Sequence, residues 1–199
     1  MTSTTAPKRL FLALLILSVS SAVILAQEPA EQIKVGDSIG AFNANDDQGN
    51  LWTSSEHMPS GKYLVVYFYP AAMTGGCTAQ ACAYRDTAAE LAAVNANVIG
   101  VSGDSVNNLK IFKQAHHLNF PLLSDVTASI AKEFGVPARK GGTFKTTVDG
   151  KEVELKRAYS TSRWTFILDD QGKVIFKNTQ VNAGQDSANV IEFLKSKRP

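Results

Sequence analysis

The sequence predicts an α/β fold built on a parallel sheet. Two apolar runs rich in β-branched and aromatic residues, Tyr63–Tyr69 and Asn97–Ser102, are each followed by a segment of helical composition. Neither run alternates between apolar and polar residues, which indicates strands that are buried on both faces. A strand–helix–strand–helix order is typical of parallel strands joined by right-handed crossovers, so these runs are expected to form the core of one sheet.

The first of these runs is expected to be the central strand. The stretch Gly36–Gly49 before it is polar and rich in turn-forming residues, and Asp46–Gly49 is typical of a tight turn. Pro70 ends the strand, and a loop over 71–76 follows. The next segment, Cys77–Val94, is rich in Ala, Gln, Glu and Leu and contains no Gly or Pro, so it predicts a helix.

The second half of the chain continues the pattern of short apolar and helical segments. Ser105–His117 predicts a second helix, with Asp104 or Ser105 as its N-cap. The remaining expected elements are a short strand at Phe120–Leu123, a short helix at Thr127–Phe134 closed by Gly135, hairpin turns at Val148–Lys151 and Asp169–Gly172, the second flanked by strands Trp164–Leu168 and Val174–Lys177, and a C-terminal helix at Asp186–Lys197.

The N-terminal segment over 1–26 differs in composition from the rest of the chain. Lys8 and Arg9 precede an uncharged apolar run over 10–26, and the first acidic residue is Glu28. A short basic region followed by an apolar run and small residues is typical of a secretory signal peptide. We therefore expect the protein to be exported.

Cleavage of this leader is expected after Ala26, with the 20–22 region as a second candidate, which leaves a single domain over 27–199. The expected location is then the periplasm, with no membrane insertion of the mature protein. An uncleaved membrane anchor is the alternative, because the 17 uncharged residues of the apolar run approach the roughly 20 that span a bilayer. Secretion from the cell is a further alternative.

Charge and cysteine content exclude several classes of function. Lys and Arg number 20 against 18 Asp and Glu, so the formal charge is +2 and no nucleic-acid partner is expected. Lys8 and Arg9 leave with the leader, so the mature domain carries no net charge. Two cysteines are too few for a disulfide framework or for a cysteine-rich zinc site. The pair is therefore free to have a chemical role.

Cys77 lies at the expected start of a helix, directly after a buried strand. A helix N-terminus presents unpaired N–H groups and the positive end of the helix dipole, and both favour a thiolate over a thiol. Gly75 and Gly76 let the backbone approach a ligand closely, Thr74 offers a hydroxyl, and Pro70 fixes the loop and excludes water. Such a pocket suits a ligand no bigger than a peroxide.

Cys82 follows five residues later on the same expected helix. Helix geometry separates the two Cα atoms by roughly 8–9 Å, whereas a disulfide normally requires less than about 7 Å. A bond between them would need the first turns of the helix to unwind, which favours a disulfide formed during turnover. A static disulfide and two inert core cysteines are the structural alternatives.

The motif Pro-x-x-x-Thr-x-x-Cys resembles the active-site motif of the peroxiredoxin family, and Cys-x-x-x-x-Cys resembles its Q subfamily, also called bacterioferritin-comigratory-protein-like. The resemblance covers about residues 33–197 and implies a thioredoxin-like fold, the peroxiredoxin variant, with a central mixed sheet flanked by helices. Further matching segments are Phe68–Pro70, Cys82–Asp86, Gly100–Ser105, Phe120–Asp125 and Arg163–Asp169.

The resemblance also implies roles for five residues. Cys77 corresponds to the peroxidatic cysteine, Cys82 to the resolving cysteine, and Thr74 to the residue that hydrogen-bonds the peroxide. Pro70 belongs to the same motif. Arg163 corresponds to the distant arginine that holds the thiolate charged and polarises the O–O bond, which a guanidinium beside a thiolate can do.

The implied activity is that of a thiol-dependent peroxidase. Hydrogen peroxide and organic hydroperoxides would be its substrates, and the cycle would pass through a sulfenic acid on Cys77 and a disulfide with Cys82. Thioredoxin or a thioredoxin-like protein would be the reductant. The resemblance implies no cofactor and a monomer.

Three features depart from the family pattern. Gly75 stands where the family usually has Pro, and Gln80 where the Q subfamily usually has Glu, so a typical acidic contact near the active-site helix is expected to be missing. The segment 139–156 is longer than expected and carries several lysines around a hairpin. We expect a solvated loop there; a role in shaping access to the site or in binding a partner is the alternative.

Two other functions fit an exported domain of this class. A thiol–disulfide oxidoreductase would use Cys-x-x-Cys, in which both sulfurs bridge without unfolding the helix. A copper-delivery protein on the same fold would use Cys-x-x-x-Cys with a remote His, and would have no use for Thr74 or Arg163. Since His57, His116 and His117 also lack the spacing of a metal site, no bound metal is expected.

Overall fold

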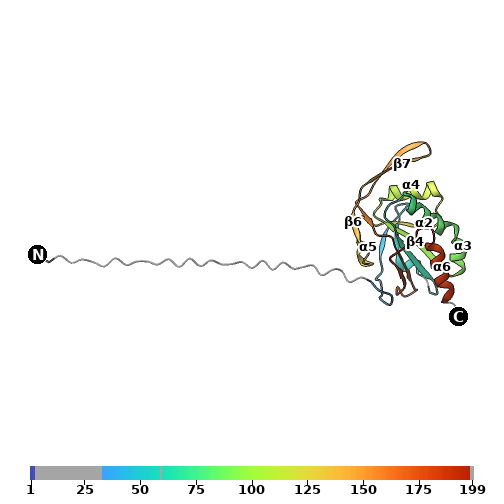
Figure 1. Ribbon diagram of the computed structural model, residues 1–199. Helices are drawn as coiled ribbons and strands as arrows, with labels where there is room; N and C mark the ends of the chain where they lie inside the picture. Colours follow the sequence, from blue (N-terminus) through green and yellow to red (C-terminus); the bar gives the residue numbers. More distant parts are fainter. Residues whose placement is uncertain (3–32, 59, 198–199) are drawn as a thin grey trace.

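A computed structural model describes residues 1–2, 33–58 and 60–197 (Figure 1). The expected leader, except for its first two residues, and both candidate cleavage sites therefore lie outside the described residues. Within the described ranges, no helix has the length and apolar character needed to cross a membrane.

Seven strands of the described chain form one mixed sheet in the order β11-β10-β3-β4-β5-β1-β2. Strands β3, β4 and β5 pair in parallel, and the flanking pairs are antiparallel. The parallel core predicted from the sequence is therefore confirmed. The strands of the sheet are β1 Asn43–Asp46, β2 Leu51–Thr53, β3 Tyr63–Phe68, β4 Ala96–Ser102, β5 Leu122–Ser124, β10 Trp164–Leu168 and β11 Val174–Asn178.

Helices cover both faces of this sheet. On one face, Val65 and Tyr67 of β3 pack with α2, α3, α4 and α6, and on the other, Leu64 and Val66 pack with α5. Strand β3 therefore has no solvent-facing side, which explains why its sequence shows no alternation. The helices are α1 Ser54–His57, α2 Gly75–Asp86, α3 Ala88–Ala93, α4 Val106–His116, α5 Ser129–Glu133 and α6 Asp186–Ser196.

Most of the predicted elements lie within a few residues of their expected places. Ser105 is the N-cap of α4, because its side chain accepts a hydrogen bond from the N–H of Asn108. The turn at 148–151 is confirmed, with Asp149 and Gly150 both at positive φ, as a type I′ hairpin turn requires. The second hairpin, β10 and β11, flanks the predicted turn at 169–172.

The long helix predicted over Cys77–Val94 is wrong in its extent. It is divided at Thr87 into α2 and α3. The hydroxyl of Thr87 donates to the carbonyl of Ala83 at 2.7 Å, and a side chain that bonds the backbone in this way competes with regular helix geometry. The helix also begins earlier, at Gly75, so Cys77 lies inside its first turn.

The polar stretch Gly36–Gly49 is more ordered than a turn-rich segment would be. It contains β1, which pairs with β2 on one side and β5 on the other. The predicted tight turn is present, since the N–H of Gly49 donates to the carbonyl of Asp46. Strand β1 was missed because its residues, Asn-Ala-Asn-Asp, have low strand propensity.

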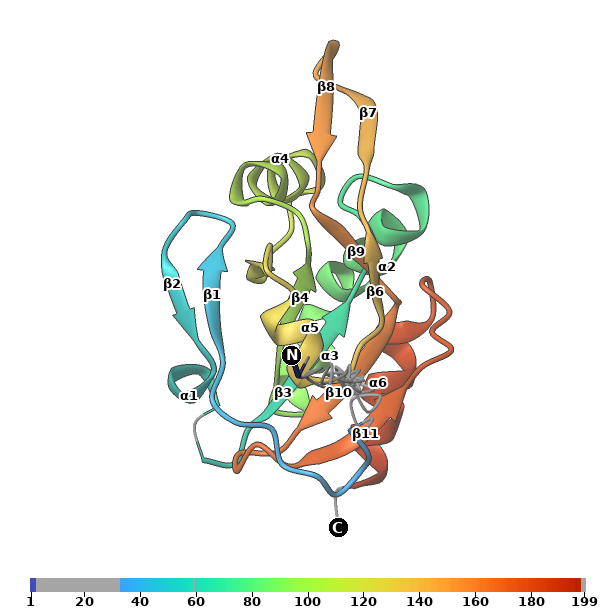
Figure 2. The same ribbon diagram turned by 90° about the vertical axis from the view of Figure 1, so that its left-hand side faces the viewer.

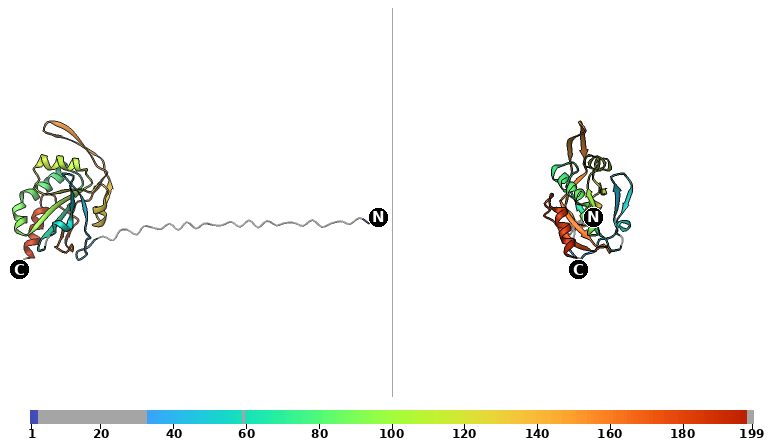
Figure 3. Two further views of the ribbon diagram at one scale, coloured as in Figure 1. Left: turned by 180° about the vertical axis from the view of Figure 1, so that it is seen from behind. Right: turned by 90° about the vertical axis from the view of Figure 1, so that its right-hand side faces the viewer.

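The segment 139–156 is exposed over most of its length, as the sequence favoured, but it consists of paired strands rather than a loop. Strands β7 Thr143–Val148 and β8 Lys151–Lys156 form a two-stranded arm, and β6 Ala138–Lys140 pairs with β9 Tyr159–Thr161 at its base. The arm projects beyond the rest of the domain (Figures 2 and 3). Leu155 near its base is fully buried in the same apolar core as Cys77.

Candidate active site

Cys77 is placed by the junction of the central strand with the helix that follows it. Strand β3 ends at Phe68, a short loop crosses the edge of the core, and α2 begins at Gly75. Thr74 is the N-cap, with extended backbone angles. The Cys77 side chain is 1% exposed. The predicted thiol at a helix N-terminus is therefore present, and it is shielded from bulk water.

Arg163 comes from the loop between β9 and β10 and reaches this thiol. Its Nη2 donates to the Sγ of Cys77 at 3.4 Å, although the two residues are 86 positions apart in the chain. A Cβ on Gly76 would lie 3.3 Å from the same Nη2, so the absence of a side chain at Gly76 leaves room for the guanidinium. The guanidinium therefore places a fixed positive charge beside the sulfur.

Thr74 and Pro70 lie where the motif predicts, on the loop that precedes α2. The Oγ1 of Thr74 donates to the carbonyl of Ala71 at 2.8 Å, so the hydroxyl is held in one orientation with its lone pairs free to accept. Pro70 and Arg163 both line a groove of about 460 Å³. This groove gives solvent a route to the guanidinium beside the buried sulfur.

The active-site loop is anchored by Asp104, whose role the sequence did not reveal. One carboxylate oxygen, Oδ2, accepts from the N–H of Ala72 at 2.8 Å and from the hydroxyl of Ser102 at 3.1 Å. The other, Oδ1, pairs with Nε of Arg157 at 2.9 Å and accepts from the side chain of Asn108. Asp104 thus joins the loop before α2 to the base of the β7–β8 arm.

Gln80 lies one helical turn after Cys77 and is fully buried. Its Oε1 accepts from Nη1 of Arg163 at 2.6 Å, and its Nε2 donates to Oδ2 of Asp186 at 2.7 Å. The acidic contact expected to be missing is therefore replaced rather than lost. The carboxylate comes from the C-terminal helix α6 and reaches the arginine through the Gln80 amide.

Asp186 is the second residue that sequence reasoning missed. Besides Gln80, the hydroxyls of Tyr84 and Thr165 donate to its Oδ2, each at 2.7 Å. Burial raises the pKa of the Asp186 carboxyl, and the hydrogen bonds from Thr165, Tyr84 and Gln80 act in the opposite direction. Burial also raises the pKa of Tyr84, which therefore remains a neutral donor.

Cys82 lies on the same helix as Cys77, and both are free thiols. Cys77 is buried and Cys82 is partly exposed. Helix α2 runs without interruption from Gly75 to Asp86, which keeps their Cα atoms roughly 8–9 Å apart. The structure therefore brings Arg163 to Cys77, places Thr74 at the N-cap of the same helix and Pro70 beside Arg163 in the groove, and does not bring Cys82 within bonding distance of Cys77.

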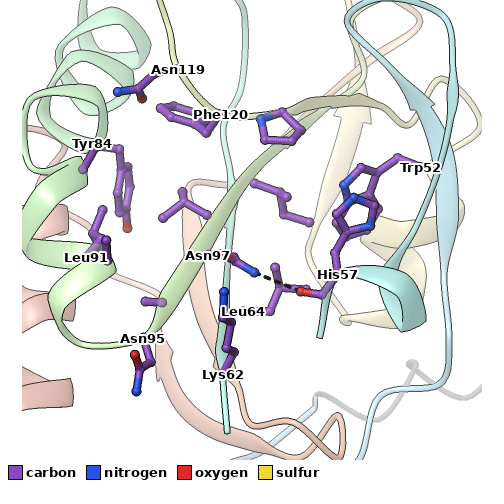
Figure 4. Close-up of a pocket in the computed structure, with 16 residues that line it drawn as sticks. Trp52, His57, Lys62, Leu64, Tyr84, Leu91, Asn95, Asn97, Asn119 and Phe120 are labelled. Carbon is purple, nitrogen blue, oxygen red and sulfur yellow. Dashed lines mark hydrogen bonds between the residues drawn. The ribbon is translucent and has the colours of Figure 1, made fainter. Parts of the chain in front are cut away.

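No histidine is among the described residues that line the groove beside Arg163. His57 stacks on Trp52 with ring centroids 4.5 Å apart, and both line a second pocket of about 410 Å³ with Tyr84, Asn97 and Phe120 (Figure 4). The described lining of this pocket includes neither cysteine. Within the described ranges, no cluster of three or more His, Cys, Asp or Glu side chains could hold a metal ion.

Comparison with known proteins places the chain in a family. The profile of the AhpC/TSA family matches residues 35–177. Peroxiredoxin Q, a chloroplastic protein of Populus jackii, is 33% identical over 181 residues, which cover 90% of this chain and 76% of that protein. Peroxidoxin BcpB from Mycobacterium tuberculosis superposes with a TM-score of 0.70 at 32% identity, over 84% of this chain and 100% of that one.

A second solved structure agrees. Peroxiredoxin Q from Xanthomonas campestris has a TM-score of 0.64 at 28% identity, and the match covers 78% of this chain and 90% of that one. The thioredoxin-like fold predicted from the sequence is confirmed, and neither the oxidoreductase nor the copper-delivery alternative is favoured. The family profile matches most of the described chain, and the relatives agree with it in both sequence and structure. The protein therefore belongs to the AhpC/TSA family and is a peroxiredoxin, an oxidoreductase that uses a thiol to reduce peroxides.

Proposed function

We propose that Cys77 is the peroxidatic cysteine of this enzyme. The observation that carries the proposal is the 3.4 Å contact between its Sγ and Nη2 of Arg163 at the start of α2. The guanidinium and the helix N-terminus both favour the thiolate, which is the nucleophilic form of cysteine. Burial of the sulfur limits the reagents that reach it to small ones.

In the first step, the Cys77 thiolate attacks one oxygen of a hydroperoxide. The S–O bond forms as the O–O bond breaks, the sulfur is oxidised to a sulfenic acid, and the other oxygen leaves as water or an alcohol after taking up a proton. Arg163 stabilises the negative charge on the departing oxygen. Since the Thr74 proton is directed to Ala71, its oxygen is placed to accept the hydrogen bond of the hydroperoxide O–H.

In the second step, we propose that Cys82 resolves the sulfenic acid. The Cys82 thiol displaces the hydroxyl of the Cys77 sulfenic acid, which gives a disulfide and water. The helical separation of the two residues is too large for this bond, so the first turns of α2 must unwind. Gly75 and Gly76 at the start of the helix lower the barrier to that unwinding, because glycine has low helix propensity.

An external dithiol then returns the enzyme to its starting state. We propose thioredoxin or a thioredoxin-like protein as this reductant, and hydrogen peroxide and organic hydroperoxides as the substrates. We further propose that residues 1–26 direct export, that 27–199 form the mature, monomeric enzyme, and that the reductant shares its compartment, the periplasm.

The test is the mass of the protein after one equivalent of hydrogen peroxide, with free thiols counted. The wild type should lose both thiols rapidly. Cys82→Ser should accumulate a sulfenic acid on Cys77, and Cys77→Ser should leave Cys82 unreacted. Slow and indiscriminate oxidation of all three proteins would exclude the proposed roles.

A further inference from the structure

We propose that Asp186 is a positioning residue for the peroxide step: it fixes the amide of Gln80, which in turn holds the guanidinium of Arg163. The inference rests on the proposed function, in which Cys77 and Arg163 act on the peroxide. It adds to that site a residue of the C-terminal helix, 106 positions from Gln80 in the chain.

The orientation of the Gln80 amide is set by its two partners. Arg163 carries only donors, so the oxygen of the amide must face it, and the carboxylate of Asp186 accepts, so the NH2 group must face the other way. The amide therefore lies with its polar ends matched to a cation on one side and an anion on the other. A hydrogen bond with a charged partner is shorter and stronger than a neutral one.

Asp186 is itself held rigidly. Its side chain is fully buried, and three donors from two different elements, Gln80 and Tyr84 on α2 and Thr165 on β10, converge on Oδ2. It is also the first residue of the eleven-residue helix α6, where the helix dipole favours an anion. A rigid acceptor at this position holds the Gln80 amide in one place through the hydrogen bond between them.

The Asp186 carboxylate is buried, with only one of its two oxygens hydrogen-bonded within the described part of the chain. Its Oδ1 has no hydrogen-bond partner among the described residues, and a buried unpaired polar atom reduces stability. An Asn at the same position could accept the same three hydrogen bonds without a charge, and its NH2 group would then lie unpaired where Oδ1 lies now. A stability cost at a buried site next to the reacting residues is the pattern expected of a group kept for activity.

Arg163 uses its two terminal nitrogens on two different partners, and this should affect the rate of attack on peroxide. Nη1 is occupied by Gln80, which leaves Nη2 for the sulfur of Cys77 and for the oxygen that departs from it. Since a guanidinium is planar, one fixed nitrogen restricts where the other can lie. Weakening the Gln80 anchor should therefore slow attack on peroxide more than it slows other reactions of the thiolate.

The experiment compares Asp186→Asn with the wild type, using the full mature chain. Two rates are measured on the reduced protein: sulfenic acid formation at Cys77 with hydrogen peroxide, and alkylation of Cys77 by iodoacetamide, which has no O–O bond to polarise. We expect the peroxide rate to fall about fivefold, because one charge-assisted hydrogen bond becomes a neutral one. The alkylation rate should fall less, within about twofold, because iodoacetamide has no departing oxygen for Arg163 to stabilise.

Asp47→Asn is the matched control. Asp47 is also a buried carboxylate, but its partners are the Lys113 ammonium and the N–H of Leu122. Its substitution should leave the ratio of the two rates at the wild-type value. A merely structural loss at Asp186 would lower both rates together and leave that ratio unchanged, which would contradict the inference.

A double-mutant cycle tests whether Asp186 acts through Gln80. Gln80→Met keeps an unbranched side chain of similar length but breaks the connection, so Asp186→Asn should cause no further loss of the peroxide rate in that background. Losses that multiply would show that Asp186 acts independently and would overturn the inference. A wild type whose Cys77 does not react with peroxide would instead overturn the proposed function.

Discussion

The carboxylate of Asp104 and the guanidinium of Arg157 form an ion pair with side chains only 0% and 5% exposed and an N–O distance of 2.9 Å. Arg157 stands at the base of the β7–β8 arm, and Asp104 also holds the N–H of Ala72 in the active-site loop. The arm and the loop are therefore tied to one buried charge. Whatever disturbs this pair should reach the loop that carries Thr74.

Arg157→Met should destabilise the protein strongly. It leaves the Asp104 carboxylate buried without its counter-ion, a change that typically costs about 3–5 kcal/mol in the free energy of unfolding. Chemical denaturation at neutral pH measures the loss. Lys145→Met, which removes an exposed partner of Glu152 in the same arm, should change it by less than about 1 kcal/mol. Equal effects of the two substitutions would contradict the assignment of Asp104 as an anchor.

Arg163→Lys should not preserve activity. A lysine ammonium is a single point charge, so it cannot contact Gln80 and Cys77 with two separate nitrogens as the guanidinium does. We expect the peroxide rate to fall by about 10²–10³, the typical loss for one donor that stabilises developing charge. Stopped-flow oxidation of Cys77 provides the measurement. Arg139→Lys, at an exposed position lining the same groove, should remain within about twofold of the wild type.

Gly75→Pro should stabilise the start of α2 and slow disulfide formation. Proline is favoured at the first helical position, the extended backbone of Thr74 suits a following proline, and a Cβ on Gly75 would meet no atom within 4 Å. The unfolding free energy should rise by about 0.4–1 kcal/mol. The lifetime of the sulfenic acid, followed by quenching and mass measurement, should lengthen because unwinding becomes harder.

The neighbouring glycine offers a matched contrast. Gly75→Ala should resemble Gly75→Pro in a weaker form, whereas a Cβ on Gly76 would lie 3.3 Å from Nη2 of Arg163 and must displace it. Gly76→Ala should therefore slow the attack on peroxide, which Gly75→Ala should leave unchanged, while each alanine should slow the later disulfide step to a similar, smaller extent. If Gly75→Ala rather than Gly76→Ala slowed the attack on peroxide, the contact between position 76 and Arg163 would not control that step.

The stability difference between Asp186→Asn and the wild type should depend on pH. Burial raises the pKa of the Asp186 carboxyl in the folded state, so the folded chain holds this proton more tightly than the unfolded chain. Below about pH 4, the ordinary pKa range of an aspartate, this group contributes its full stabilisation to the folded wild type. That stabilisation is lost as the pH rises through the raised pKa of the folded state. The Asn variant has no such loss, so its Tm relative to the wild type should increase from pH 4 to pH 7. A difference that stays constant over this range would show that the carboxyl titrates alike in both states.

Local patterns predicted the elements that hold Cys77. The unbroken apolar run of β3, the proline after it and the two glycines before the cysteine are all contiguous features. The strand, the loop and, to within two residues, the start of α2 could therefore be placed from the sequence. The break at Thr87 could not, because helix propensity contains no term for a hydroxyl that bonds a carbonyl four residues earlier.

Contacts between distant segments were predictable only where a family motif named them. Arg163 was found through its motif, and by composition alone it would have been assigned to the solvated surface. Asp186 lies in a segment that shows only the periodicity of an amphipathic helix, and nothing near it marks the residue as a partner of Gln80. Its role depends on how α6 packs against α2, which is a property of the folded chain.

The position of Asp186 also bears on the order in which the enzyme is completed during synthesis. Cys77 and Gln80 leave the ribosome about a hundred residues before the helix that supplies this carboxylate. A nascent chain therefore displays the cysteine long before Arg163 can be held beside it. If Asp186 positions Gln80 as proposed, a chain that lacks the last helix should carry a thiol that peroxide oxidises more slowly.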